Sequence, residues 1–431
     1  MHPRFLVLLI AGAVLSLSAH SANLMQVYQD ARVNDSQFAS ARDSLAAGEE
    51  KTTQGRAGLL PSLGVSGNYA RTQIMDYDTI ANDSYTISLS QPLFNWGNYQ
   101  LYEQGKLATA SSEAQFAQAQ QDLIVRVAQA YFDVLAAQDA LAFVRAQKVA
   151  ISEQLESAKR NFEVGTATIT DTHEAQARYD LAVAQEFAGI SDLEIKRAAL
   201  QQIIGKYPSE LAPLKPAISI SSPEPGRMDA WVNAAENQNY GVIGSRLALE
   251  TAKRAISLNR AGHYPTVNLV ASRTHSNQAA SAVPITVATP SNNSVGVQWN
   301  IPLFSGFAVT SRVREAIALE DKARNDLETA RRNAAQLARQ SFIGVTSGLA
   351  QVKALEAAEV SSQSALESNK LGYEVGVRIN IDVLNAQQQV YSTLRDLARA
   401  RYDTIMNGLK LKSAAGTLKE EDLLKVSLLL Q

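Results

Sequence analysis

The chain has 431 residues, with 40 basic and 42 acidic side chains and no cysteine. The nearly balanced charge gives no reason to expect a nucleic-acid partner. The absence of cysteine excludes disulfides, thiolate metal sites and a cysteine nucleophile. Length by itself would allow two or three domains.

Residues 1–21 are expected to form a secretory signal peptide. Arg4 precedes an apolar run over 5–17, and small and polar residues follow up to Ala22. This run is shorter than the about 20 residues that a transmembrane helix needs, so a signal peptide is favoured over an N-terminal anchor helix. No later stretch has membrane-spanning length without polar residues. If the mature chain crosses a membrane, it is expected to do so with strands.

Residues 24–59 have helical periodicity, with a weak point near Asn34 and Asp35. The period then changes to two within 61–94, which predicts two strands that each have one apolar and one polar face. The apolar positions are Leu63, Val65, Tyr69, Tyr85, Ile87 and Leu89. In a soluble sandwich this apolar face would be the core, whereas in a membrane it would contact lipid.

A long helix is predicted over 99–162, because apolar residues recur there at three- and four-residue spacing. At a rise of 1.5 Å per residue it would be about 95 Å long. A turn over 163–171 leads to a further helix over 171–204. The helices over 24–59 and 171–204, placed end to end, would match the length of the long one.

A proline-rich connector over 205–227 cannot continue a helix. It separates a first structural repeat, 22–220, from a second one, 221–431. AGLLPSL at 57–63 returns as AGHYPTV at 261–267, and QPLF at 91–94 returns as IPLF at 301–304. The second repeat is therefore predicted to contain a helix over 228–261, strands within 265–304, a long helix over 306–373, a turn over 374–382, a helix over 380–413 and a terminal segment over 414–431.

The two turns also repeat one another. EVGTATITDTHEAQ at 163–176 and EVGVRINIDVLNAQ at 374–387 share Glu, Val, Gly, Asp, Ala and Gln in register. A Val-Gly pair suits the end of a helix, because glycine adopts the left-handed conformation that a C-cap needs. Asp171 and Asp382 suit the start of the next helix, where a carboxylate stabilises free N–H groups. Each turn is thus predicted to be the tip of a helical hairpin.

Each repeat supplies two predicted strands, so one chain supplies four. Four strands do not close on themselves, and an open sheet edge is not tolerated in lipid. Closure would need several chains. Three would supply twelve strands, although composition by itself does not fix that number.

With these features the chain resembles the TolC family of outer-membrane export channels. The matching segments are NLMQVYQDAR at 23–32, LLPSLG at 59–64, AYFDVLAAQDAL at 130–141, VGTATITD at 164–171, GYEVGVRINIDVLNAQ at 372–387 and LKSAAGTL at 411–418. The resemblance implies an α+β membrane protein, a homotrimer in which a 12-stranded outer-membrane β-barrel with four strands per chain continues into a long periplasmic α-helical barrel. The connector and the segment 414–431 would belong to an equatorial collar around the helices.

The resemblance also implies a gate at the helical tips. In the family a tyrosine and an arginine on one tip bond to an aspartate and a threonine on the neighbouring tip. By position these are Tyr373 and Arg378, with Asp171 and Thr170. On their chemistry alone, Asp171 and Asp382 would be helix caps, Tyr373 a core aromatic residue and Arg378 a solvated charge. Capping and gating can coexist.

Two further sets of residues follow from the resemblance. At the entrance constriction the family pattern has two aspartates three residues apart. Here Asp382 matches the first, and Asn385 replaces the second. A ring of six carboxylates in a trimer would become a ring of three, which implies weaker cation binding. Gly165 and Gly376 match the positions at which periplasmic adaptor hairpins dock.

The expected function is that of a trimeric exit duct in the outer membrane, extending into the periplasm and exporting small molecules, proteins or both. A periplasmic adaptor and an inner-membrane transporter would recruit the duct, untwisting of the tips would open it, and outer-membrane lipid would surround its strands. No enzyme, cofactor or metal is expected, since the histidines are scattered and Asp171, His173 and Glu174 are only a weak candidate cluster. The alternative is a structural coiled-coil protein of the cell envelope, which would not need four amphipathic strands.

Overall fold

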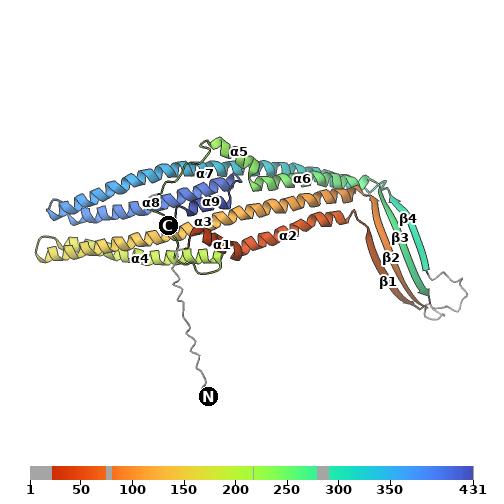
Figure 1. The fold of residues 1–431 in the computed structure, drawn as a ribbon, viewed down its shortest axis with the longest axis horizontal. Coiled ribbons are helices and arrows are strands. Elements are labelled where there is room, and N and C mark those ends of the chain that lie inside the picture. Colours follow the sequence, from red (N-terminus) through yellow and green to blue (C-terminus); the bar gives the residue numbers. More distant parts are fainter. Residues whose placement is uncertain (1–21, 74–79, 217, 279–290, 431) are drawn as a thin grey trace, which may run out of the picture.

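The protein is an elongated rod of antiparallel helices with a sheet at one end (Figure 1). The computed structural model describes residues 22–73, 80–216, 218–278 and 291–430. The sheet bends away from the rod, and both helical hairpin tips lie at the opposite end (Figure 1). The predicted signal peptide, 1–21, lies outside the described residues.

The helices follow the periodicity of the sequence in both repeats. The first repeat contains α1 (Leu24–Asn34), α2 (Ser36–Ala57), α3 (Trp96–Glu163) and α4 (Ile169–Ile204), and the second contains α5 (Met228–Gln238), α6 (Tyr240–Arg260), the 3₁₀ turn η1 (Ala261–His263), α7 (Ala308–Glu374), α8 (Asn380–Ala414) and α9 (Glu420–Ser427). With 68 residues, α3 is about 100 Å long. It packs against α2 and α4 of its own repeat and against α6 and α8 of the other. Within the described residues, none of the helices combines the length and apolarity needed to cross a membrane.

The weak point near Asn34 and Asp35 is a capped break between α1 and α2. The Asp35 carboxylate accepts a hydrogen bond from the backbone N–H of Phe38 at 2.7 Å, at the start of α2. It accepts two more from Arg126 of α3, at 2.9 and 3.0 Å, and its side chain is only 4% exposed. Burial by itself would raise the pKa of Asp35, but the hydrogen bonds from Arg126 and from the backbone hold this pKa below its ordinary value.

The second repeat contains a matching break that the helical periodicity does not reveal. The spacing predicts one helix over 228–261, which is wrong, because α5 and α6 are separated at Asn239. The Asn239 side chain accepts hydrogen bonds from the N–H groups of Gly241 and Val242 and donates one to the carbonyl of Ala414 at 3.0 Å. Asn239 follows Asp35 by 204 residues, the offset that also relates AGLLPSL to AGHYPTV. The break is therefore part of the duplication.

Two left-handed glycines fit against these breaks. Gly205 ends α4 with a φ of 74°, and Gly416 follows α8 with a φ of 71°. A Cβ atom at Gly416 would lie 2.2 Å from the carbonyl oxygen of Gln238, and one at Gly205 would lie 3.0 Å from Asn34 Cβ. In each repeat, the end of the hairpin's second helix thus packs against the break in the pair of shorter helices.

The sheet joins the two repeats. Its strands are β1 (Ser62–Thr72), β2 (Ile80–Phe94), β3 (Thr266–Gln278) and β4 (Ser291–Asn300), which are antiparallel and lie in the order β1-β2-β3-β4. The central pair, β2 and β3, comes from different repeats and aligns Leu89 with Ala271. One face of the sheet is apolar and exposed in the single chain, with Val65 at 74% and Val295 at 79%. The predicted α+β chain with four strands is confirmed.

The largest apolar core lies midway along the rod, where both repeats meet. Phe132 of α3 and Leu423 of α9 are buried in it. The hydroxyl of Tyr131 donates hydrogen bonds to the backbone carbonyls of Ala22 and Ala212, at 3.1 and 2.8 Å. This core fastens the connector and α9 to the long helices.

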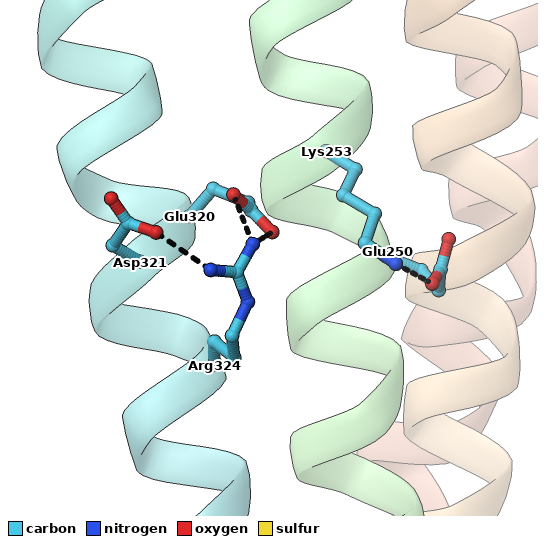
Figure 2. Close-up of polar contacts among 5 residues, drawn as sticks. All are labelled: Glu250, Lys253, Glu320, Asp321 and Arg324. Atoms are coloured by element: carbon cyan, nitrogen blue, oxygen red, sulfur yellow. Dashed lines mark hydrogen bonds and ion pairs between the residues drawn. The ribbon is translucent and has the colours of Figure 1, made fainter.

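Between the sheet and this core, α6 and α7 carry ion pairs within each helix (Figure 2). Arg324 reaches back along α7 to Glu320 at 2.7 Å and to Asp321 at 2.9 Å. On α6, Lys253 pairs with Glu250 at 2.7 Å. An exposed pair within a helix contributes about 0.3–0.5 kcal/mol. Lys253 and Glu250 form such a pair, whereas the side chain of Glu320 is only 11% exposed.

Candidate gate at the helical tips

The two hairpin tips have the same backbone structure. Gly165 and Gly376 adopt φ values of 78° and 77° directly after α3 and α7. In each tip the N–H of the glycine and the N–H of the next residue bond back to two carbonyls of the preceding helix, at 2.8–3.1 Å. The left-handed backbone favours glycine, which is why a Val-Gly pair ends each helix.

The outer surface of both tip glycines is open. A Cβ atom at Gly165 or at Gly376 would have no neighbour within 4 Å. A side chain at either position would therefore strain the backbone without a clash inside the chain. The predicted adaptor positions thus have room for contact with another molecule.

At the first tip, Thr168 is the N-cap of α4, Asp171 is its capping-box partner and Thr170 is exposed. The Asp171 carboxylate accepts hydrogen bonds from the N–H and from the hydroxyl of Thr168, at 2.9 and 2.8 Å. The N–H of Asp171 donates in return to Thr168 Oγ1 at 3.3 Å. This capping box satisfies the first free N–H groups of the helix.

At the second tip, Tyr373 and Arg378 have partners other than the predicted ones. The Tyr373 hydroxyl accepts a hydrogen bond from Asn161 Nδ2 of α3 at 3.0 Å. Arg378 lies 3.6 Å from Asp382, one turn further along. Within the described part of one chain, no bond joins the predicted gate residues of the two tips.

Asn380, which the sequence did not single out, joins the two hairpins. It lies at the start of α8 and is 2% exposed. Its amide donates to the carbonyl of Asp171 at 3.4 Å, and its side-chain oxygen accepts a hydrogen bond from Gln154 of α3. One turn further, Leu384 packs in an apolar cluster with Leu155. A polar residue at a helix start is ordinarily interpreted as a cap, so no local signal pointed to this contact.

Arg178 of α4 was also missed, and it reaches the predicted entrance residue Asn385. One guanidinium nitrogen donates to Asn385 Oδ1 at 3.0 Å, and another donates to Gln388 Oε1 at 2.6 Å. The two acceptors are three residues apart on one face of α8, so each binds a different nitrogen of the planar guanidinium. A cationic group is therefore fixed where the family pattern has a second carboxylate.

The weak candidate metal cluster at Asp171, His173 and Glu174 is not assembled. In the part of the chain that the structure describes, no three side chains of His, Cys, Asp or Glu are placed to hold an ion.

The sequence of this chain is similar to those of known proteins over nearly its whole length. The family model described as "Outer membrane efflux protein" matches residues 27–206 and 231–417. The chain is 33% identical over 431 residues to Outer membrane protein TolC of Vibrio cholerae serotype O1, with 98% of each chain covered. It is 32% identical to the alkaline protease secretion protein AprF of Pseudomonas aeruginosa, over 98% of this chain and 91% of the relative.

A solved structure shares the fold at lower identity. The outer membrane protein VceC of Vibrio cholerae superposes with a TM-score of 0.79 at 18% identity, over 91% of this chain and 96% of that chain. The family resemblance that the matching sequence segments indicated is confirmed. This chain belongs to the outer membrane efflux protein family.

Proposed function

We propose that the chain forms, as a homotrimer, an exit duct that spans the outer membrane and continues through the periplasm. The observation that carries this proposal is a sheet with an exposed apolar face and with β1 and β4 at its edges, at the end of a rod about 100 Å long. Backbone groups at a sheet edge have to be paired inside lipid, so each edge needs a neighbouring copy. Three copies supply twelve strands and enclose a passage, with six long hairpins below it.

We propose that the cargo includes both small molecules and proteins. The family is described by efflux, and one relative is named for alkaline protease secretion. A periplasmic adaptor and an inner-membrane transporter select the cargo and supply the energy. The open faces of Gly165 and Gly376 support adaptor docking at the tips, because they leave room for a partner's side chains.

The gate is proposed to close through Tyr373 and Arg378 of one tip and Thr170 and Asp171 of the neighbouring tip. Thr170 is exposed, and among the described residues Arg378 forms one ion pair, a long and partly exposed contact at 3.6 Å from Asp382. A partly exposed pair of this kind contributes about 0.2–1 kcal/mol. Threefold repetition brings the sum to a few kcal/mol, which keeps the open state rare but within reach of an adaptor's binding energy.

Opening requires the hairpin of α7 and α8 to move relative to that of α3 and α4. Such a movement breaks contacts inside one chain, which include the Asn161–Tyr373 hydrogen bond, the fork of Arg178 and the links of Asn380. These polar contacts lie close to the tips, beside the apolar cluster in which Leu384 packs with Leu155. The apolar core midway along the rod is far from them and holds the chain together during the movement.

Single-channel recording tests the gate. The double variant Arg378→Ser with Tyr373→Phe is expected to raise the conductance in planar bilayers and to make cells permeable to large antibiotics, because it removes the links at all three interfaces. Trimer yield in the outer-membrane fraction should stay unchanged.

Arg399→Ser is the matched control. Arg399 lies 3.7 Å from Asp403 on the same helix with the same four-residue spacing, but further from the tip. It should leave the conductance unchanged. Wild-type conductance in the double variant would mean that its residues are only caps and packing groups. If the protein itself were found free in the periplasm and not in the outer membrane, the proposed duct would be contradicted.

A further inference from the structure

The apolar face of the sheet becomes basic towards the ends of the strands that are remote from the helices. Residues paired across antiparallel strands point to the same face. One row aligns Leu63, Leu89, Ala271 and Val295, and the next row away from the helices aligns Val65, Ile87, Arg273 and Asn293. The row after that aligns Gly67, Tyr85, His275 and Ser291. Arg273 and His275 therefore lie on the same face as the apolar side chains.

Two more rows extend this face towards the strand ends. Tyr69 pairs with Asp83, and Arg71 follows two residues later on the same side of β1. Among the described residues, the face thus carries two arginines and a histidine together with the carboxylate of Asp83, which has contacts of its own. We call Arg71, Arg273 and His275, with Tyr69 and Tyr85, the basic patch.

Aromatic side chains mark both edges of the apolar band. Trp299 lies at the edge near the helices and is 68% exposed, with the stacked rings of Trp96 and Tyr99 beyond it at the start of α3. Tyr85 and Tyr69 lie at the other edge. The rise of about 3.4 Å per residue between Ser291 and Trp299 gives about 27 Å along β4, close to the roughly 25 Å band that strands expose to lipid between two aromatic girdles.

The basic patch is built around these outer tyrosines. Arg71 Nε donates a hydrogen bond to the Tyr69 hydroxyl at 2.6 Å, and the guanidinium lies 5.7 Å from the centre of that ring. The His275 ring lies 5.2 Å from the Tyr85 ring, and His275 Nδ1 is 3.0 Å from Ser291 Oγ. Arg273 is exposed and lies one row nearer the helices than His275. Its long stem can lie along the apolar band while its guanidinium reaches the same girdle.

We propose that the basic patch binds the phosphate groups of the phosphorylated glycolipid in the outer leaflet. The inference rests on the proposed duct, in which the helices point into the periplasm and the far girdle lies at the external headgroup level. A guanidinium matches phosphate oxygens in a bidentate fork, and an arginine near the edge of the bilayer needs an anionic partner. Arg71 of β1 supplies one guanidinium, and Arg273 of β3, aligned through Ile87 with Val65, supplies another, six residues nearer the helices. The tyrosines lie between these two levels of the sheet.

Lipid binding to the purified trimer in nanodiscs tests this proposal. The two probes are the phosphorylated outer-leaflet glycolipid and the same lipid after removal of its phosphates. Native mass spectrometry measures how much of each lipid stays bound to the trimer. The wild-type trimer is expected to prefer the phosphorylated form by roughly tenfold, as two charge-assisted contacts per site imply. Arg71→Gln with Arg273→Gln should abolish the preference, whereas Arg71→Lys with Arg273→Lys should keep part of it.

The control variant Arg395→Gln with Arg399→Gln removes two exposed arginines from the helical rod and should retain the full preference. Equal binding of the two lipids by wild type, or an unchanged preference in the Gln variant, would overturn the proposal. Displacement of the lipid by millimolar inorganic phosphate would also contradict it, since that would mean a site for the free anion. Conductance of the same samples reports separately on the duct, and it should be unchanged in all the variants.

Discussion

Single residues decide the charge at the proposed entrance. Asn385 stands where the family pattern has a carboxylate, and Arg178 adds a guanidinium 3.0 Å from the amide oxygen of Asn385. Asp382 is therefore the one remaining carboxylate of the predicted pair, and Arg378 lies 3.6 Å from it. Opposite charges about 4 Å apart attract by about 1–4 kcal/mol at realistic dielectric constants, so a neighbouring arginine offsets most of the pull of one carboxylate on a cation.

Polyvalent cations are therefore expected to block this channel only weakly. Asn385→Asp by itself should change the block little, because the new carboxylate would pair with Arg178. Combined with Arg178→Gln, it should strengthen the block by roughly tenfold or more. Titration of single-channel current with a trivalent cation measures this, with Arg178→Gln alone as the control. Strong block in Asn385→Asp alone would show that Arg178 does not neutralise the site.

At the scale of elements, a polar contact holds α8 of the second repeat against α3 of the first. The hydroxyl of Tyr402 donates a hydrogen bond to Asp139 Oδ2 at 2.6 Å. Burial raises the pKa of Asp139 above its ordinary value, and the hydrogen bond from Tyr402 offsets only part of this rise. Stability from this carboxyl is therefore fully present below its unfolded pKa, about 4, and is lost as the pH rises through the folded pKa.

Asp139→Asn is expected to raise the unfolding temperature of the trimer at pH 7, because it removes a buried charge and keeps an oxygen that accepts from Tyr402. The difference from wild type should shrink as the pH falls and vanish once the pH is below the carboxyl's unfolded pKa, about 4. Asp403→Asn, which changes an exposed carboxylate on α8, controls for the loss of one charge. A difference that is the same at both pH values would refute the role of burial.

At the scale of the whole molecule, the proposed transport depends on partners that reach the tips. Gly376→Trp is expected to leave trimers in the outer membrane but to abolish efflux, because a large side chain would occupy the open face proposed for adaptor docking. Gly376→Ala is the matched control. It imposes the same left-handed strain, about 1 kcal/mol, without the bulk, and should retain efflux. Drug accumulation in cells measures both variants, and normal efflux in Gly376→Trp would contradict the proposed docking.

Local patterns in the sequence by themselves determined the kinds of element and their repetition. Helix and strand periods depend only on the direction in which successive side chains point, so the long helices and the alternating strands were predictable. The Val-Gly tips were predictable for a similar reason, since a left-handed residue after a helix favours glycine in any context. The weak point at Asp35 was also visible, because a polar cap interrupts the apolar pattern there.

Which of these elements contact one another could be seen in the folded chain alone. The break at Asn239 depends on a hydrogen bond to Ala414, and the fork of Arg178 depends on α4 lying beside α8. The pairing of β2 with β3 places Arg273 and His275 beside Ile87 and Tyr85, although the strands come from different repeats. Such contacts join residues distant in sequence, and no local period records them. The candidate gate residues were therefore recognisable by resemblance, whereas their contacts required the fold.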